Sequence, residues 1–288
     1  MYFQRVKRQK NAMKPKPSEF SLRKQAKRPI SMITAYDFPA ARLLDECGVD
    51  IVLLGDSLGT TVLGYESITQ VTMNDIMHHL RAVVRGAHSS FILGDMPYGS
   101  IATPDLARGN AALMRSAGAD AVKMEGGREI VPQVRAVTLQ GIAVCAHIGF
   151  MPQTGGRPGI VGKTFDQARA LIDAALALQE AGAFMIVLEL IPHELAAEIT
   201  RLLSIPTIGI GAGKSCDGQV QVFHDLLGLS PRIFRHVKDF AGGRQLFTKA
   251  ILHYVADVCS GAFPAESNAS AMPHEALAQL KDWLKTKM

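Results

Sequence analysis

The chain has 288 residues, of which 48% are hydrophobic and 6% aromatic, and it carries a formal net charge of +5. This composition favours a helix-covered parallel sheet over a β-sandwich or a disordered chain. We find no apolar run long enough to span a bilayer and no signal-peptide pattern, so we expect a soluble, cytoplasmic protein. Four scattered cysteines without a CxxC pair predict free thiols rather than a zinc site.

The positive charge is concentrated in residues 1–28, which hold ten Lys or Arg and one acidic residue. The rest of the chain is mildly acidic, so it is not expected to form a general nucleic-acid or membrane surface. We expect residues 1–29 to be a disordered basic tail because they hold few apolar residues. An organellar transit peptide or a nucleic-acid arm is the alternative interpretation.

From residue 30 onward, short β-branched segments alternate with longer amphipathic segments. The predicted strands cover residues 30–36, 50–55, 91–94, 121–124, 142–146, 184–188 and 206–210, with an eighth near 221–227. The predicted helices include residues 39–47, 73–85, 104–116, 129–139, 165–180 and 193–203. Several of these helices are followed by a glycine, as is typical of helix C-termini.

This alternation, without a break in composition, predicts a single (β/α)8 TIM barrel over residues 30–264. A doubly wound open sheet is the alternative, but no GxGxxG motif follows the first predicted strand. The glycine-rich segment 209–218 comes late in the chain and lacks P-loop spacing. Residues 265–288 are predicted to be a linker and a short amphipathic helix, which could dock on the barrel or on a neighbouring subunit.

Polar side chains follow most of the predicted strands directly. They are Asp56, Ser57, Asp95, Lys123, Glu125, His147 and Glu189. In a barrel, the carboxyl ends of all strands open onto one face, where active sites lie, so these side chains should meet there. Four carboxylates in one pocket repel one another unless a cation compensates, and oxygen ligands without a His/Cys cluster favour Mg²⁺. We predict that Asp56, Asp95 and Glu125 bind the metal ion and that Glu189 remains free for proton transfer.

Each of these residues also has an ordinary structural interpretation. A single acid after a strand is more often a helix N-cap than a ligand. Lys123 could be an ion-pair partner of Glu125, Ser57 a cap, and His147 a hydrogen-bonded core histidine. Polar groups fall by chance at five strand ends less often than at one. The whole set is therefore stronger evidence for a functional site than any one of its residues.

Six segments make the functional interpretation specific. They are GDSLG, GDMPYGS, VKMEGG, CAHIGFMPQ, VLELIP and GIGAGKSCDGQ. In the same order and at similar spacing, they resemble the 3-methyl-2-oxobutanoate hydroxymethyltransferase family, also called ketopantoate hydroxymethyltransferases. The resemblance covers residues 30–264, and the combination of segments is far more selective than any one of them.

The resemblance implies a Mg²⁺-dependent barrel enzyme of pantothenate biosynthesis that is a decamer of two pentameric rings. Such an enzyme transfers a one-carbon unit from 5,10-methylenetetrahydrofolate to 3-methyl-2-oxobutanoate and forms 2-dehydropantoate. The implied metal ligands are Asp56, Asp95 and Glu125, and the implied keto-acid ligands are Asp56, Ser57, Asp95 and Lys123. The implied proton acceptor is Glu189, and we expect His147 to orient a polar group.

Two other functions stay open at this point. The nearest is another Mg²⁺-dependent, enolate-handling barrel that resembles phosphoenolpyruvate mutase and isocitrate lyase, although no KKCGH-like lyase segment occurs. The second is a non-catalytic protein that binds nucleic acid through its basic tail, which the intact set of pocket acids disfavours. The polar residues between Gly156 and Lys163 depart from the family pattern, which leaves the folate contacts of this loop open.

Overall fold

The computed structural model describes residues 14–154, 159–231 and 234–287, and the chain divides into two compact units, Met1–Phe240 and Ala241–Met288. In the first unit, eight parallel strands form a closed barrel in which neighbours in sequence pair and β8 returns to β1. The strands are β1 (Ile30–Thr34), β2 (Ile51–Leu54), β3 (Phe91–Asp95), β4 (Ala121–Glu125), β5 (Ala143–Gly149), β6 (Met185–Glu189), β7 (Thr207–Ile210) and β8 (Gly218–Gln221). The predicted (β/α)8 barrel is confirmed.

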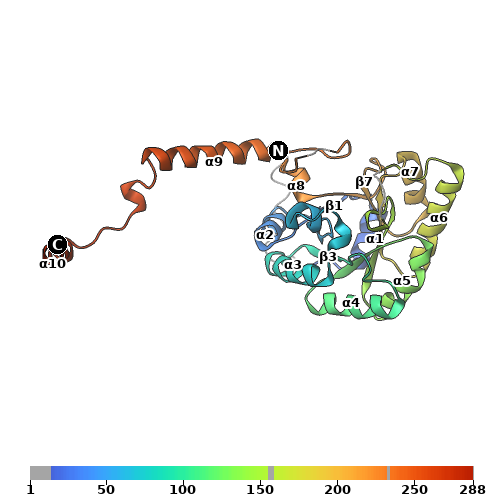
Figure 1. Cartoon of the computed structure of the whole chain (residues 1–288). Coiled ribbons are helices and arrows are strands. Elements are labelled where there is room, and N and C mark those ends of the chain that lie inside the picture. Colours follow the sequence, from blue (N-terminus) through green and yellow to red (C-terminus); the bar gives the residue numbers. More distant parts are fainter. Residues whose placement is uncertain (1–13, 155–158, 232–233, 288) are drawn as a thin grey trace. The chain divides into compact units, whose positions relative to one another are not determined.

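Helices surround the barrel and connect its strands (Figure 1). They are α2 (Phe38–Glu46), α3 (Met73–Gly86), α4 (Pro104–Ser116), α5 (Val131–Thr138), α6 (Phe165–Glu180), α7 (His193–Leu202) and the short α8 (Phe223–Leu226). Among the residues described, no helix is long and apolar enough to cross a membrane.

Two apolar layers hold this unit together. Alternate strand residues such as Ile51, Leu53 and Leu93 point into the barrel and form the inner cluster, as the two-residue period of a strand requires. The residues between them, such as Val52 and Ile92, pack against the surrounding helices in the outer cluster. The same alternation decides which side chains at the carboxyl ends of the strands face the barrel mouth.

The N-terminal segment closes the opposite end of the barrel. Helix α1 (Pro17–Gln25) carries Phe20, which is fully buried in the inner cluster, with its ring 5.3 Å from the ring of Phe91 in an edge-to-face contact. The prediction of a disordered tail over residues 1–29 is therefore wrong for α1, because one aromatic side chain and several ion pairs anchor this otherwise polar segment. The prediction for residues 1–13 lies outside the described residues.

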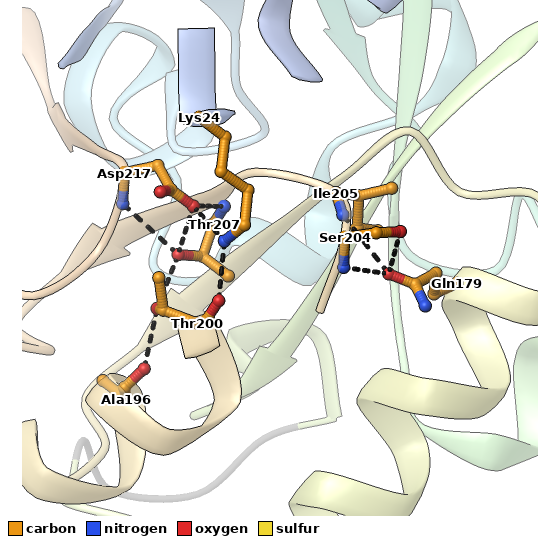
Figure 2. Close-up of polar contacts among 8 residues, drawn as sticks. All are labelled: Lys24, Gln179, Ala196, Thr200, Ser204, Ile205, Thr207 and Asp217. Carbon is orange, nitrogen blue, oxygen red and sulfur yellow. Dashed lines mark hydrogen bonds and ion pairs between the residues drawn. The ribbon is translucent and has the colours of Figure 1, made fainter. Parts of the chain in front are cut away.

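Basic residues of this segment pair with aspartates that stand immediately before strands. Lys14 contacts Asp120 at 2.9 Å, and Arg23 contacts Asp50 at 2.7 Å. Figure 2 shows the third pair, in which Lys24 Nζ lies 2.8 Å from Asp217 Oδ2 and donates to the Thr200 carbonyl. These contacts explain how a strongly basic segment becomes part of an acidic barrel.

The same close-up shows how β7 and β8 are joined at their amino ends. Asp217 Oδ2 also accepts from the backbone N–H of Thr207 at 2.9 Å, and the Thr207 and Thr200 hydroxyls lie 2.7 Å apart (Figure 2). Nearby, Gln179 Oε1 accepts from the N–H groups of Ser204 and Ile205, which connects α6 to the segment before β7.

The last barrel strand differs from the prediction. We expected it near residues 221–227, where the apolar residues gather, but β8 is Gly218–Gln221 and the apolar residues that follow form α8. Gly218 permits the close pairing with β1, because a Cβ there would stand 2.4 Å from the Ile30 carbonyl oxygen. The eighth strand therefore begins at a glycine rather than at an apolar run.

The second unit contains α9 (Gly243–Ser260) and α10 (His274–Lys285). The first compact unit ends at Phe240, whereas the sequence predicts a barrel domain up to residue 264. The short amphipathic helix that the sequence predicts within residues 265–288 corresponds to α10, whereas the sequence analysis does not predict α9.

We expect Phe20→Ala to lower the free energy of unfolding by about 3 to 5 kcal/mol, because it empties a fully buried aromatic position at the end of the barrel. Leu22→Ala, on the same helix but 57% exposed, is the matched control and should cost less than about 0.5 kcal/mol. Urea unfolding of the two variants measures the difference. Equal stabilities would mean that α1 does not close the barrel in solution.

Candidate active site

Strand pairing brings the predicted site residues together at the carboxyl end of the barrel. Asp95 of β3 lies opposite Lys123 of β4, and Glu125 lies opposite His147 of β5. Glu189, at the end of β6, lies opposite Gly149 of β5. Because these residues occupy inward-facing positions of their strands, their side chains converge on the barrel mouth.

The site is a small cavity of about 140 Å³. All seven predicted site residues line it: Asp56, Ser57, Asp95, Lys123, Glu125, His147 and Glu189. Five of them are less than 10% exposed, whereas the Glu189 side chain is 18% exposed. The cavity therefore holds several ionisable groups away from water, with one carboxylate at its edge.

The alternative that these acids cap helices does not hold for Asp56 and Asp95. Helix α3, which follows β2, is capped by Thr72, which accepts from the N–H of Asp75. Helix α4, which follows β3, is capped by Thr103, which accepts from the N–H of Leu106. The two aspartates are therefore left for the cavity.

Lys123 and Asp95 form a buried ion pair at the floor of the cavity. Lys123 Nζ donates to Asp95 Oδ2 at 2.6 Å, and both side chains are almost completely buried. Burial lowers the pKa of Lys123, but the negative charges of Asp95, Asp56 and Glu125 raise it further, so the net shift is upward. Lys123 is thus charged at neutral pH and offsets one of the surrounding carboxylates.

Asp56 is the carboxylate that this lysine does not neutralise fully. Its burial, together with the nearby charge of Asp95, raises its pKa to about 7. Asp56 Oδ2 accepts a hydrogen bond from Gln153 Nε2 at 2.8 Å, and its own N–H donates to Asp95 Oδ2 at 3.3 Å. In this arrangement, Asp56 is poised between its neutral and ionised forms near physiological pH.

His147 lies between two carboxylates. Its Nδ1 is 3.2 Å from Glu125 Oε2, and its Nε2 is 3.3 Å from Glu189 Oε2. Burial and the charge of Lys123 lower the pKa of His147, but its interactions with Glu125 and Glu189 outweigh them and raise the pKa to about 9. The imidazole is therefore positively charged at neutral pH and holds the Glu189 carboxylate at the edge of the cavity.

Two further residues shape the site and were not assigned from the sequence. Gln153, in the short 3₁₀ helix Pro152–Thr154, donates through its backbone N–H to Glu125 Oε1 at 2.8 Å and through Nε2 to Asp56. The hydroxyls of Tyr36 and Ser57 lie 2.9 Å apart. The MPQ segment after β5 was the one signal for Gln153, whereas the position of Tyr36, two residues beyond β1, carried no such signal.

Two features decide whether the cavity could hold a metal ion: carboxylate oxygens that are free to bind it, and the net charge of the ionisable side chains. Among the described residues, no three Asp, Glu, His or Cys side chains are arranged so that they could hold one metal ion. Mg²⁺, however, typically needs one or two protein carboxylates and keeps water ligands. Asp95 Oδ1 is buried, and none of the residues that the structure describes forms a hydrogen bond with it. When ionised, the four carboxylates exceed the charges of Lys123 and protonated His147 by two, which fits a divalent cation.

Comparisons with known proteins agree on one family. The family model described as "Ketopantoate hydroxymethyltransferase" matches residues 15–266. A 3-methyl-2-oxobutanoate hydroxymethyltransferase of Chloroflexus aggregans is 47% identical over 253 residues, which are 86% of this chain and 91% of that protein. A protein of the same name from Dehalococcoides mccartyi is 45% identical over 270 residues, which are 92% of this chain and 96% of that protein.

Solved structures with the same fold are more distant in sequence. A phosphoenolpyruvate phosphomutase from Streptomyces platensis subsp. rosaceus superposes with a TM-score of 0.62 at 13% identity, covering 95% of this chain and 97% of that one. A phosphonopyruvate hydrolase superposes with a TM-score of 0.60, also at 13% identity, covering 94% and 96%. These likenesses concern the barrel fold alone.

We expect the imidazole of His147 in the metal-free protein to titrate near pH 9, well above an ordinary histidine, because two carboxylates hold its charged form. Glu189→Gln removes one of these charges, so the midpoint should fall. NMR of the ring carbons and nitrogens across pH 5 to 10 measures both titrations. The half-buried His224, whose pKa is lowered chiefly by burial, is an internal control that should not respond. An unchanged His147 midpoint in the variant would contradict the contact with Glu189.

Proposed function

The chain belongs to the ketopantoate hydroxymethyltransferase family, and from this premise we propose that it converts 3-methyl-2-oxobutanoate to 2-dehydropantoate with Mg²⁺ bound and 5,10-methylenetetrahydrofolate as the donor. One observation carries the proposal for this site. Glu189, the carboxylate at the edge of the cavity, is held by His147 beside a buried group of acids that one lysine neutralises only in part. This combination suits removal of a proton beside a carbonyl group.

The small cavity suits the keto acid. A five-carbon 2-oxo acid carries one negative charge, and Lys123 and Ser57 line the cavity as a cation and a hydrogen-bond donor for its oxygens. Tyr36 orients the Ser57 hydroxyl through their 2.9 Å contact. Apolar residues of the same cavity, Leu53 and Val187, offer a surface for the branched end of the substrate.

The acidic residues would hold the metal ion. Asp56, Asp95 and Glu125 are the proposed ligands, supported by the free Oδ1 of Asp95 and by the excess negative charge. When bound, Mg²⁺ supplies a positive charge that polarises the 2-oxo group and offsets the negative charge that develops on its oxygen. Gln153 holds Asp56 and Glu125 in position from the loop above them.

Glu189 would act as the general base on the keto acid. It removes the proton from C3, and the electron pair of that bond moves toward the 2-oxo group to give an enolate. His147, charged and fixed between Glu125 and Glu189, keeps the Glu189 carboxylate pointed at the cavity. Lys123 adds positive charge to the same space as the enolate forms.

The one-carbon transfer balances with one molecule of water. Carbon C3 of the keto acid forms a bond to the methylene carbon of the donor, and both bonds from that carbon to the donor nitrogens break. The hydroxyl group of the product comes from water. The C3 proton and the second water proton end on the two donor nitrogens, so no oxidant or reductant is required.

The direct test is incubation of the full chain with 3-methyl-2-oxobutanoate, 5,10-methylenetetrahydrofolate and Mg²⁺, followed by proton NMR. The proposal requires 2-dehydropantoate to form, and to form only when all three are present. Folded protein that leaves the keto acid unchanged would overturn it. That result would instead favour another enolate-handling barrel reaction or a non-catalytic role.

We also propose that the protein is a homodecamer and that it is located in the cytoplasm. The family resemblance supports both proposals.

Glu189→Gln should slow the exchange of the C3 proton with D₂O at least about 100-fold, because the amide cannot accept the proton. Keto-acid binding should change by no more than a few fold, since Glu189 lies at the edge of the cavity. Proton NMR of the keto acid with Mg²⁺ and without donor measures the exchange. Glu198→Gln, at an exposed position of α7, is the matched control. Exchange at the wild-type rate in Glu189→Gln would remove Glu189 from the base role.

Asp95→Asn should weaken Mg²⁺ binding at least tenfold, because it replaces a buried charged oxygen by a neutral one. Calorimetry with the metal alone measures the affinity without any reaction. Asp105→Asn, whose side chain is 87% exposed on α4, changes the net charge equally and should bind Mg²⁺ as the wild type does. Circular dichroism verifies that the variants are folded. Unchanged affinity in folded Asp95→Asn would contradict its assignment as a metal ligand.

A further inference from the structure

The Ser57 hydroxyl belongs to a chain of hydrogen bonds that continues away from the cavity. Its oxygen lies 2.9 Å from the phenol oxygen of Tyr36, a residue that is 2% exposed. A hydroxyl group can donate or accept, so this distance alone does not decide which oxygen carries the shared proton. The direction matters because it determines whether Ser57 offers a proton or a lone pair to a molecule in the cavity.

The chain continues from Tyr36 to Thr34, the last residue of β1. Thr34 lines the same cavity as Ser57, and its side chain hydrogen-bonds to the Tyr36 phenol. Thr34 Oγ1 also accepts a 2.9 Å hydrogen bond from the backbone N–H of Phe223, at the start of α8. Three hydroxyl groups therefore connect this backbone amide to the keto-acid cavity.

The amide at one end fixes the direction of the whole chain. A backbone N–H can only donate, so Thr34 Oγ1 accepts from Phe223 and has its own proton left to donate. In the reverse direction, that proton would need another acceptor at a position that is 2% exposed, where an unpaired proton is costly. The favoured order is therefore Thr34 to Tyr36 to Ser57, which leaves the Ser57 proton directed into the cavity.

Tyr36 is held in place for this role by its own contacts. The Tyr36 carbonyl accepts a hydrogen bond from Nδ1 of His79 on α3, and the ring of His224 lies 5.7 Å from the Tyr36 ring. Burial raises the pKa of Tyr36 to about 12, so the phenol keeps its proton at neutral pH. Tyr36 is thus a fixed, neutral donor to Ser57.

The first glycine of the GDSLG segment leaves space for the Ser57 hydroxyl. A Cβ at Gly55 would stand 2.9 Å from Ser57 Oγ and 3.6 Å from the methyl carbon of Thr34. A larger residue there would push the hydroxyl away from Tyr36. The segment therefore supplies both the hydroxyl group and the space that it occupies.

We propose that Thr34 and Tyr36 are positioning residues, which transmit the direction of the Phe223 N–H so that the Ser57 hydroxyl always donates to the 2-oxo acid. The inference rests on the proposed function, in which Ser57 donates to the keto acid, and adds Thr34 and the Phe223 amide as the groups that make Ser57 a donor. A donor suits this substrate because its carboxylate and its enolate oxygen can only accept. Each hydrogen bond in such a chain also polarises the next one.

A double-mutant cycle on C3 proton exchange tests the chain, with Mg²⁺, with keto acid below saturation and without the one-carbon donor. Tyr36→Phe keeps the ring and should lower the exchange rate at least about fivefold. In a Ser57→Ala background, which retains the proposed base, the same substitution should change the rate less than about twofold, because no hydroxyl is left to orient. A residue that only supports the fold would lower the rate equally in both backgrounds.

Thr34 provides an independent pair of variants. Thr34→Val has nearly the same shape but breaks the chain, so it should lower the exchange rate at least about threefold, whereas Thr34→Ser keeps the hydroxyl and should stay within about twofold of the wild type. Tyr254→Phe, at a 56% exposed position of α9, is the matched control for the tyrosine and should exchange normally. Circular dichroism verifies that each variant is folded, and one folded variant that lacks a hydroxyl of the chain is enough for the test.

Exchange at the wild-type rate in folded Tyr36→Phe or Thr34→Val would overturn the inference. An equal loss of rate from Tyr36→Phe with and without the Ser57 hydroxyl would also overturn it, because Tyr36 would then act by another route. Failure of the proposed function is a separate result, since the wild-type protein itself would then show no C3 exchange.

Discussion

The buried ion pair between Lys123 and Asp95 is the contact on which the site depends. A lysine inside a barrel is costly unless its charge is met, and here three carboxylates meet it. Burial, together with the nearby charge of Asp95, raises the pKa of Asp56, and within the described part of the chain one oxygen of Asp95 has no hydrogen-bond partner. The pocket is thus built with a deficit of positive charge, which the divalent cation of the proposed function would offset.

The two ends of the barrel have different roles: the amino ends of the strands contribute to stability, and the carboxyl ends carry the candidate site. At the amino ends of the strands, Phe20 fills the interior and Lys24 pairs with Asp217, so the floor is closed by apolar packing and satisfied ion pairs. At the carboxyl ends, the side chains that continue the same inward positions are charged. Because the strands are short and fixed by their neighbours, the positions of Lys123 and Glu125 are decided by the barrel rather than by flexible loops.

The convergence of the seven residues on one cavity could be predicted because each lies at or just beyond the carboxyl end of a barrel strand, while their roles stay predictions. Longer-range features could not. Helix α1 is held by one phenylalanine and by ion pairs with residues up to 193 positions away, which no local pattern reveals. The eighth strand begins at Gly218, whose role is a close approach to Ile30. Gln153 reaches Asp56 across 97 residues from a loop, so its contact exists only once the barrel is closed.

The most direct test of this account is a crystal structure of the chain grown with Mg²⁺ and 3-methyl-2-oxobutanoate. The account predicts the ion beside Asp95 and Asp56 in the small cavity, with the keto acid between that ion and Glu189 and its C3 carbon facing the Glu189 carboxylate. A keto acid bound elsewhere, or an acidic pocket that keeps only Lys123, Gln153 and His147 as partners at saturating Mg²⁺, would contradict it.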